Sequence, residues 1–231
     1  MQRRKHHPTK EFRERTLFRL DASIRVEGSH SRDIADIAER EWLSAIPEAD
    51  VIRRSVGTEP IPSTAWGAAA FAGYTPEEHR TPDQREAIRL ATTLADELLA
   101  ADAFLFAVPI YNYGVSQHFK SWVDMIITDS RFNPAEPPAI AGKPAMLVTV
   151  HGGYYAEGTP RHAWDHATPW MQRILADVWG LDLNTVVSEF SLVGVNPALD
   201  EFKDLATTLR ADAENRAREL GRRLTTPSAS R

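Results

Sequence analysis

Residues 104–114 read Phe104-Leu-Phe-Ala-Val-Pro-Ile-Tyr-Asn-Tyr-Gly114. The apolar run that begins at Ala103 predicts a strand that is buried on both faces, as in parallel sheets covered by helices. Pro109 cannot donate a hydrogen bond to a neighbouring strand, so we expect the strand to end there. The segment that follows is aromatic, and ligands bind beyond the carboxyl ends of parallel strands. The stretch therefore predicts a central strand that ends at a binding site.

Strand and helix patterns alternate along the rest of the chain. Short apolar segments predict five strands, at 17–22, 50–56, 103–109, 143–150 and 183–190. Helical spacing separates them, and residues 57–81 read as a long irregular connection before a helix that begins at Pro82 with Thr81 as its cap. This alternation predicts an α/β fold, a doubly wound five-stranded parallel sheet in the order 2-1-3-4-5 with helices on both faces.

Composition limits the classes of function. The chain has 231 residues and no cysteine, so any redox chemistry must come from a bound cofactor. The formal net charge is -5, but residues 1–16 carry six Lys or Arg against two Glu, which leaves an acidic body. An acidic body argues against nucleic acid as a partner, because phosphate backbones bind to basic faces.

The domain organisation follows from the same reading. No stretch resembles an interdomain linker, so we expect one folded domain at 17–222. Residues 1–16 read as a disordered basic extension and residues 223–231 as a flexible tail. No apolar run approaches the ~20 residues that a membrane-spanning helix needs, and the first residues lack the apolar core of a secretory signal. We therefore expect a cytoplasmic protein without a membrane partner.

Three loops at predicted strand ends have unusual content. The first, residues 23–31, places three serines before a helix, whose N–H groups and dipole favour an anion. In the second, Asn112 lies between Tyr111 and Tyr113, a combination suited to the polar edge and flat faces of a heterocycle. In the third, Gly152 and Gly153 permit close approach of the backbone to a ligand. The predicted strand order makes these loops neighbours.

Each loop also has an ordinary structural explanation. Serines before a helix are commonly N-caps, the tyrosines would pack on the next helix, and Gly-Gly forms flexible turns. His162 and His166 have the spacing of two metal ligands, with Asp165 nearby, but no third ligand has a sensible spacing. We expect no metal site, and only the convergence of the three loops favours a ligand.

The same loops resemble a known family. The segment Val108-Pro-Ile-Tyr-Asn-Tyr-Gly-Val-Ser116, together with the Ser23 to Ser31 loop and Thr149-Val-His-Gly-Gly153, is similar to the FMN-binding loops of FMN-dependent NADH:azoreductases and related NAD(P)H:quinone reductases. The resemblance covers roughly residues 17–222. It implies a flavodoxin-like fold that binds FMN.

The resemblance also implies roles for individual residues. Those that would hold the phosphate and ribityl end are Ser23, Ser29, His30 and Ser31. Those that would hold the isoalloxazine are Ile110, Tyr111, Asn112 and Tyr113, and those that would line its other edge are Val150, His151, Gly152 and Gly153. The sequence departs from the family in having Val150 where a small polar residue is common and His30 where Gln is common.

The activity implied by the resemblance is a two-electron, ping-pong reaction. NADH or NADPH would give a hydride through flavin N5 to a quinone or azo compound, with the chemistry carried by the cofactor. Tyr155 and His162 are the candidates for proton donation or stacking, because they lie near the loops in sequence. The related enzymes are homodimers, and residues 66–74 are the candidate segment for contact with a partner.

Two other functions stay open at this point. A flavodoxin-like FMN-binding electron carrier would need the same loops without turnover of an organic substrate. A phosphohydrolase or sugar-nucleotide protein would use the serine loop for phosphate, but it would need a basic or metal-bearing site that the sequence does not offer.

Overall fold

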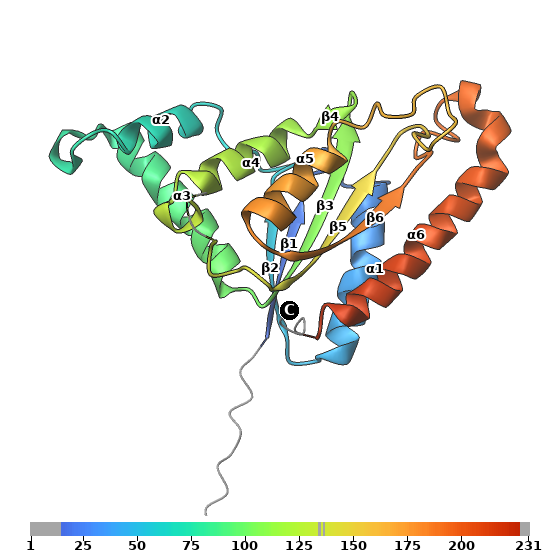
Figure 1. Ribbon diagram of the computed structural model, residues 1–231, viewed down its shortest axis with the longest axis horizontal. Coiled ribbons are helices and arrows are strands. Elements are labelled where there is room, and N and C mark those ends of the chain that lie inside the picture. Colours follow the sequence, from blue (N-terminus) through green and yellow to red (C-terminus); the bar gives the residue numbers. More distant parts are fainter. Residues whose placement is uncertain (1–14, 134, 136, 227–231) are drawn as a thin grey trace, which may run out of the picture.

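The computed structural model describes residues 15–133, 135 and 137–226. Five long strands form a parallel sheet in the order β2-β1-β3-β5-β6, and a short strand pairs antiparallel with β3 (Figure 1). The strands are β1 (Thr16–Asp21), β2 (Asp50–Ser55), β3 (Ala103–Tyr111), β4 (Gly114–Val115), β5 (Pro144–Val150) and β6 (Asp182–Ser188). Without the short β4, this is the predicted 2-1-3-4-5 order, so the fold class is confirmed.

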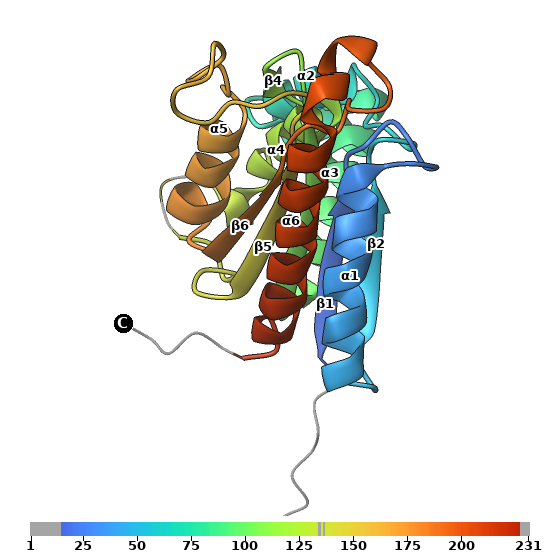
Figure 2. The same cartoon turned by 90° about the vertical axis from the view of Figure 1, so that its right-hand side faces the viewer.

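Helices cover both faces of the sheet, as predicted. One face is covered by α1 (His30–Ala45) and α6 (Lys203–Arg223), which lie side by side in Figure 2. The other face is covered by α3 (Pro82–Ala100), α4 (Gln117–Ile127) and α5 (Thr168–Gln172), the last of which continues as the π-helical segment η3 (Arg173–Val178). The capping box of Thr81 and Gln84 begins α3, so the predicted start at Pro82 is confirmed.

The alternation of β3 divides the core into two layers. Phe104 and Phe106 point toward α3 and α4, whereas Leu105 packs with α1 and α6. The first layer is aromatic, and the ring of Phe106 lies 6.1 Å from that of Trp122 on α4. Burial of both faces explains why the strand reads as an unbroken apolar run rather than an alternating one.

The expected end of the central strand at Pro109 is wrong, because β3 continues to Tyr111. The last backbone hydrogen bond from the end of β1 joins the Ala22 N–H to the Ala107 carbonyl at 2.9 Å. The backbone groups of residues two apart in a strand point toward the same neighbouring strand. The backbone nitrogen of Pro109 therefore points to the side of β1, as the Ala107 carbonyl does, but β1 has already ended at this level. The missing N–H of Pro109 therefore costs no ladder bond, and Pro109 pairs in register with Val150 of β5.

The connection at 57–81 is not irregular throughout, which corrects the second expectation. It contains α2 (Ala65–Ala72), an alanine-rich helix, and the short 3-10 helix η1 (Glu77–His79). Alanine is the strongest helix former, and five of the eight residues of α2 are alanines. Reading the glycines and prolines as breakers missed this helix, because the prolines flank it.

The domain boundaries differ by a few residues from the expected ones. Thr16 already belongs to β1, and Arg223 is the last residue of α6. Leu224 is buried, so it belongs to the folded domain rather than to a tail. The rest of the expected extension and tail, 1–14 and 227–231, lies outside the described residues. Within the described part of the chain, no helix is long and apolar enough to cross a membrane.

Candidate functional site

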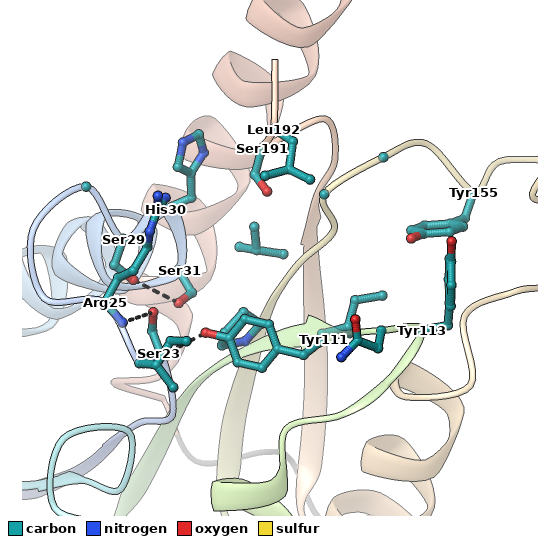
Figure 3. Close-up of a pocket in the computed structure, with 18 of the residues that line it drawn as sticks. Ser23, Arg25, Ser29, His30, Ser31, Tyr111, Tyr113, Tyr155, Ser191 and Leu192 are labelled. Carbon is teal, nitrogen blue, oxygen red and sulfur yellow. Dashed lines mark hydrogen bonds between the residues drawn. The ribbon is translucent and has the colours of Figure 1, made fainter. Parts of the chain in front are cut away.

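The three loops meet at the carboxyl edge of the sheet and enclose a cavity of about 390 Å³. This volume falls in the roughly 300–1,000 Å³ range of small-molecule sites. The hydroxyl of Tyr111 accepts a hydrogen bond from the Ile24 N–H at 3.2 Å, which joins the loop after β1 to the end of β3. Figure 3 shows the serines and His30 on one side of this cavity and Tyr113 and Tyr155 on the opposite side.

The structure brings most of the expected residues together. Of the twelve residues expected to contact a cofactor, eleven line the cavity: Ser23, Ser29, His30, Ser31, Ile110, Tyr111, Asn112, Tyr113, Val150, Gly152 and Gly153. Other lining residues were not expected there: Ile24, Arg25, Gly28, Pro109, Arg161, Ser191 and Leu192. Tyr155, expected near the reaction rather than at the cofactor, also lines the cavity.

One end of the cavity is built to receive an anion. Ser23, Ser29 and Ser31 are buried there, at the N-terminus of the 16-residue helix α1. Ser29 occupies the N-cap position, yet its side chain caps no backbone N–H, and its Oγ lies 3.4 Å from the Oγ of Ser31. The first N–H groups of a helix have no partner within the helix. Because Ser29 does not cap them, the ordinary N-cap explanation fails, and the loop offers hydroxyls and helix N–H groups together.

One arginine, Arg25, lines this end of the cavity, and a second, Arg210, lies near His30 but is paired with Glu214 at 2.7 Å. Burial lowers the pKa of His30 below its ordinary 6.5, and the nearby positive charges of Arg210 and Arg25 lower it further, against the opposing effect of Asp33. His30 is therefore neutral at pH 7, and a bound anion would raise its pKa by offsetting the two arginines.

The shifted pKa of His30 predicts a pH dependence of stability. Just below pH 6.5, His30 is more fully protonated in the unfolded chain than in the folded protein. The contribution of His30 to the free energy of unfolding therefore falls as the pH drops through this range. We expect His30→Gln to lose less stability than wild type between pH 7 and pH 5.5 in urea unfolding. Equal losses in the two proteins would contradict the prediction, and NMR titration of the imidazole gives the pKa directly.

The opposite end of the cavity is aromatic and rests on a tight hairpin. Asn112 and Tyr113 connect β3 to β4 with φ angles of 50° and 65°, the pattern of a type I′ turn. A tyrosine in this conformation is uncommon, and such strain concentrates at functional sites. The turn brings the Tyr113 ring to 6.1 Å from that of Tyr155 and 5.2 Å from that of Trp164, edge to face in both cases.

The third loop closes the cavity by pairing with the segment after β6. The Leu192 N–H donates to the Gly152 carbonyl at 3.2 Å, and the Ser191 N–H donates to the His151 carbonyl at 3.0 Å. A Cβ on Gly152 would lie 2.8 Å from Cδ1 of Leu192, so this glycine makes room for Leu192. Ser191 and Leu192 carry no motif, and only the position of β6 beside β5 could have indicated them.

Comparison with known proteins agrees with this geometry. The family model for the flavodoxin-like fold matches residues 15–212. An FMN-dependent NADH:quinone oxidoreductase of Frankia casuarinae is 39% identical over 204 residues, covering 87% of this chain and 96% of the relative. The chain belongs to the FMN-dependent NADH:quinone oxidoreductase family. A member from Streptomyces avermitilis is 33% identical over 213 residues, covering 90% of this chain and 98% of the relative.

Solved structures with the same fold are more distant in sequence from this member of the family. An azoreductase from Bacillus anthracis str. Sterne has a TM-score of 0.73 at 19% identity, covering 90% of this chain and 99% of the other. An FMN-dependent NADH-azoreductase from B. anthracis str. Ames Ancestor, in complex with FMN, has a TM-score of 0.69 at 13% identity, covering 89% and 99%. At these identities the likeness concerns the fold alone.

Three histidines were expected at the site, and in this family member two of them, His151 and His162, do not line the cavity. His151 is buried under the cavity: its Nε2 lies 3.4 Å from Asp165, its Nδ1 lies 3.6 Å from Glu189, and its ring packs 5.1 Å from that of Tyr155. His162 is exposed and does not line the cavity, and its backbone N–H donates to the Thr159 carbonyl at 3.1 Å. Among the described residues, no cluster of three potential metal ligands is present.

Proposed function

We propose that this protein binds FMN in the cavity, oxidises NADH and reduces a quinone or an azo compound. One observation carries the proposal: a single cavity joins an end with three buried serines and Arg25, at the N-terminus of α1, to an aromatic end. FMN has the two matching parts, a phosphate and a planar ring, so the donor set fits it. When bound, the flavin supplies hydride transfer, and the protein supplies binding, orientation and electrostatics.

The residues divide into three proposed roles. The phosphate and ribityl end would be held by Ser23, Ser29, His30 and Ser31, and the ring by the β3–β4 hairpin from Ile110 to Tyr113. The other edge of the ring would meet Val150, Gly152 and Gly153. In place of a contact by its side chain, His151 would support this edge from beneath, through Asp165 and Glu189. Val150 offers the ring an apolar contact only.

Tyr155 is the proposed proton donor or stacking partner at the aromatic end. Burial and the neighbouring Tyr113 raise the pKa of Tyr155 above its ordinary 10.0, although Arg161 opposes this shift. The hydroxyl therefore stays protonated at neutral pH and can donate to an acceptor in the cavity. His162, the other candidate, is exposed, and we propose no contact for it with the bound substrate.

Separate timing of the two half-reactions tests these roles. We expect Tyr155→Phe to slow reduction of the quinone by about 100-fold, the lower end of what a positioned proton donor contributes, with little effect on oxidation of NADH. His162→Ala is expected to change neither half-reaction. Stopped-flow absorbance at the flavin bands follows both steps, and unchanged rates in Tyr155→Phe would rule out proton donation by this residue.

The function itself is tested on the purified protein. We expect a yellow protein with flavin bands that oxidises NADH when a quinone or azo dye is supplied, and NADPH is assayed beside NADH as the alternative donor. A yellow protein without turnover would support the flavodoxin-like electron carrier. A colourless protein that ignores added FMN would reject both flavin functions.

We also propose a homodimer formed through residues 66–74, which include most of α2. Trp66 is exposed there, and Phe71 and Tyr74 are 70% and 89% exposed. Figure 1 shows α2 at the far end of the molecule from α6. Neighbouring exposed apolar side chains of this size commonly mark protein contacts. We expect a dimer in sedimentation at micromolar concentration and a monomer for Phe71→Glu; a monomeric wild-type protein would contradict the proposal.

A further inference from the structure

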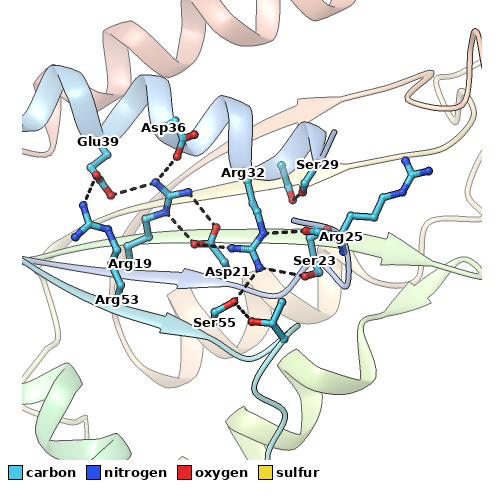
Figure 4. Close-up of polar contacts among 12 residues, drawn as sticks. Arg19, Asp21, Ser23, Arg25, Ser29, Arg32, Asp36, Glu39, Arg53 and Ser55 are labelled. Carbon is cyan, nitrogen blue, oxygen red and sulfur yellow. Dashed lines mark hydrogen bonds and ion pairs between the residues drawn. The ribbon is translucent and has the colours of Figure 1, made fainter. Parts of the chain in front are cut away.

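Arg32 lies in the first turn of α1, directly after the serines of the anion end, where its position suggests a phosphate ligand. Its guanidinium does not line the cavity and instead points beneath the loop (Figure 4). Nε donates to the Arg25 carbonyl at 3.0 Å, and Nη2 donates to the Ser23 carbonyl at 3.2 Å and to Ser55 Oγ at 2.8 Å. Nη1 lies 3.3 Å from Asp21. One side chain thus ties the loop after β1 to the ends of β1 and β2.

The charge of Arg32 is balanced within the protein. Asp21 also accepts two hydrogen bonds from Arg19, at 3.1 Å and 3.2 Å. Arg19 in turn contacts carboxylates of α1, one of which also pairs with an arginine of β2. The resulting ion-pair row, shown in Figure 4, consists of Arg19, Arg32, Arg53, Asp21, Asp36 and Glu39, with three charges of each sign. Arg32 therefore has no free charge to offer a ligand.

The carbonyl contacts determine where the loop's N–H groups point. In a trans peptide the C=O of one residue and the N–H of the next point in opposite directions. Because Arg32 holds the Ser23 carbonyl from below, the Ile24 N–H points away from Arg32, and it donates to the Tyr111 hydroxyl at 3.2 Å. The same reasoning turns the Val26 N–H away from Arg32, since the Arg25 carbonyl is held as well.

We propose that Arg32 is a positioning residue for the FMN phosphate, acting through the backbone of residues 23–26 and never touching the ligand. The inference rests on the proposed function and deepens it. Through the peptide between Ser23 and Ile24, Arg32 also links the anion end of the cavity to Tyr111 at the ring end. A loop fixed before the ligand arrives loses less entropy on binding, and this is the contribution of Arg32.

A comparison of FMN with riboflavin distinguishes a specific loss of phosphate binding from a general disruption of the cavity. Riboflavin has the same ring and ribityl chain but no phosphate. Arg32→Gln removes hydrogen bonds made by a charged donor, so we expect it to weaken FMN binding about tenfold or more while riboflavin binding changes less than about threefold. Arg32→Lys keeps the charge beside Asp21, but one ammonium cannot reach acceptors that lie in several directions. The FMN affinity of Arg32→Lys is expected to lie between those of wild type and Arg32→Gln.

Arg53→Gln is the matched control. It removes the same charge from the same ion-pair row, but the Arg53 side chain is 53% exposed and contacts Glu39 rather than the loop. We expect its affinities for FMN and riboflavin to equal those of wild type. If Arg53→Gln weakens FMN as much as Arg32→Gln does, or if Arg32→Gln weakens both flavins equally, the positioning role is overturned.

Hydrogen exchange on the apoprotein gives a readout that needs no flavin. We expect the Ile24 amide to lose protection in Arg32→Gln and to keep it in Arg53→Gln, with circular dichroism unchanged in both. Unchanged protection in Arg32→Gln would overturn the proposed tie. A wild-type protein that binds neither flavin would reject the proposed function. If the wild type binds FMN and Arg32→Gln has the same preference for FMN over riboflavin, only the positioning role is rejected.

Discussion

Gly57→Ala is expected to weaken FMN binding by about 100-fold, a loss of about 2.8 kcal/mol of binding free energy. Gly57 follows β2, and its N–H donates to the Asp21 carbonyl at 3.2 Å. A Cβ at this position would lie 2.0 Å from the carbonyl oxygen of Ser23 and 2.4 Å from its carbonyl carbon. Both atoms are backbone, so the first residue of the anion end must move to admit a single methyl group.

Fluorescence titration of the apoprotein with FMN measures this loss, beside urea unfolding of each protein. Overpacking also costs stability, about 1–3 kcal/mol, so the control must share that cost. Gly221→Ala provides it, because its Cβ would lie 2.6 Å from the carbonyl oxygen of Ala38, where α6 packs on α1 away from the cavity. We expect Gly221→Ala to lower stability and keep FMN affinity. Wild-type affinity in Gly57→Ala would mean that the Ser23 backbone is free to move.

The sheet could be predicted because its signals are local and agree with one another. Apolar runs alternate with helical spacing, and the right-handed connection rule leaves few strand orders. Pro109 was misread because the cost of a missing N–H depends on whether a neighbouring strand is present at that level. The neighbouring strand β1 ends at Asp21, which pairs with Ala107, and no residue next to Pro109 in the sequence indicates this.

The candidate site was predictable because three unusual loops follow neighbouring strands. The serines before a helix and the Tyr-Asn-Tyr segment each have an ordinary explanation, and it was their predicted convergence at one edge of the sheet that indicated a binding site. The type I′ turn was missed because its second central residue is Tyr113 rather than glycine. His151 shows the opposite limit, since it was expected to contact the cofactor and its side chain instead lies beside Asp165. No sequence pattern indicated Arg32, whose side chain lies beside Asp21.

Arg19→Leu is expected to lower the free energy of unfolding by about 3–5 kcal/mol, the cost of removing one partner from a buried ion pair. This is a large part of the roughly 5–15 kcal/mol that stabilises a domain. Burial opposes the charge of Arg19, but Asp21 and Asp36 outweigh it and raise the pKa, so the guanidinium is charged at any pH where the protein folds. Its loss leaves Asp21 and Glu39, both buried, with one cation each.

A second substitution separates lost contacts from unbalanced charge. Combining Arg19→Leu with Glu39→Leu restores equal numbers of positive and negative charges in the ion-pair row, and replacement of a buried ion pair by apolar side chains is often neutral or stabilising. We therefore expect the double variant to be more stable than the sum of the two single changes, by urea unfolding of the apoprotein at pH 7. Asp36→Asn should cost less than about 1 kcal/mol, because the Asp36 side chain is 49% exposed. Additive losses would mean that Arg19 stabilises the protein by its packing and not by balancing the carboxylates beneath the anion end.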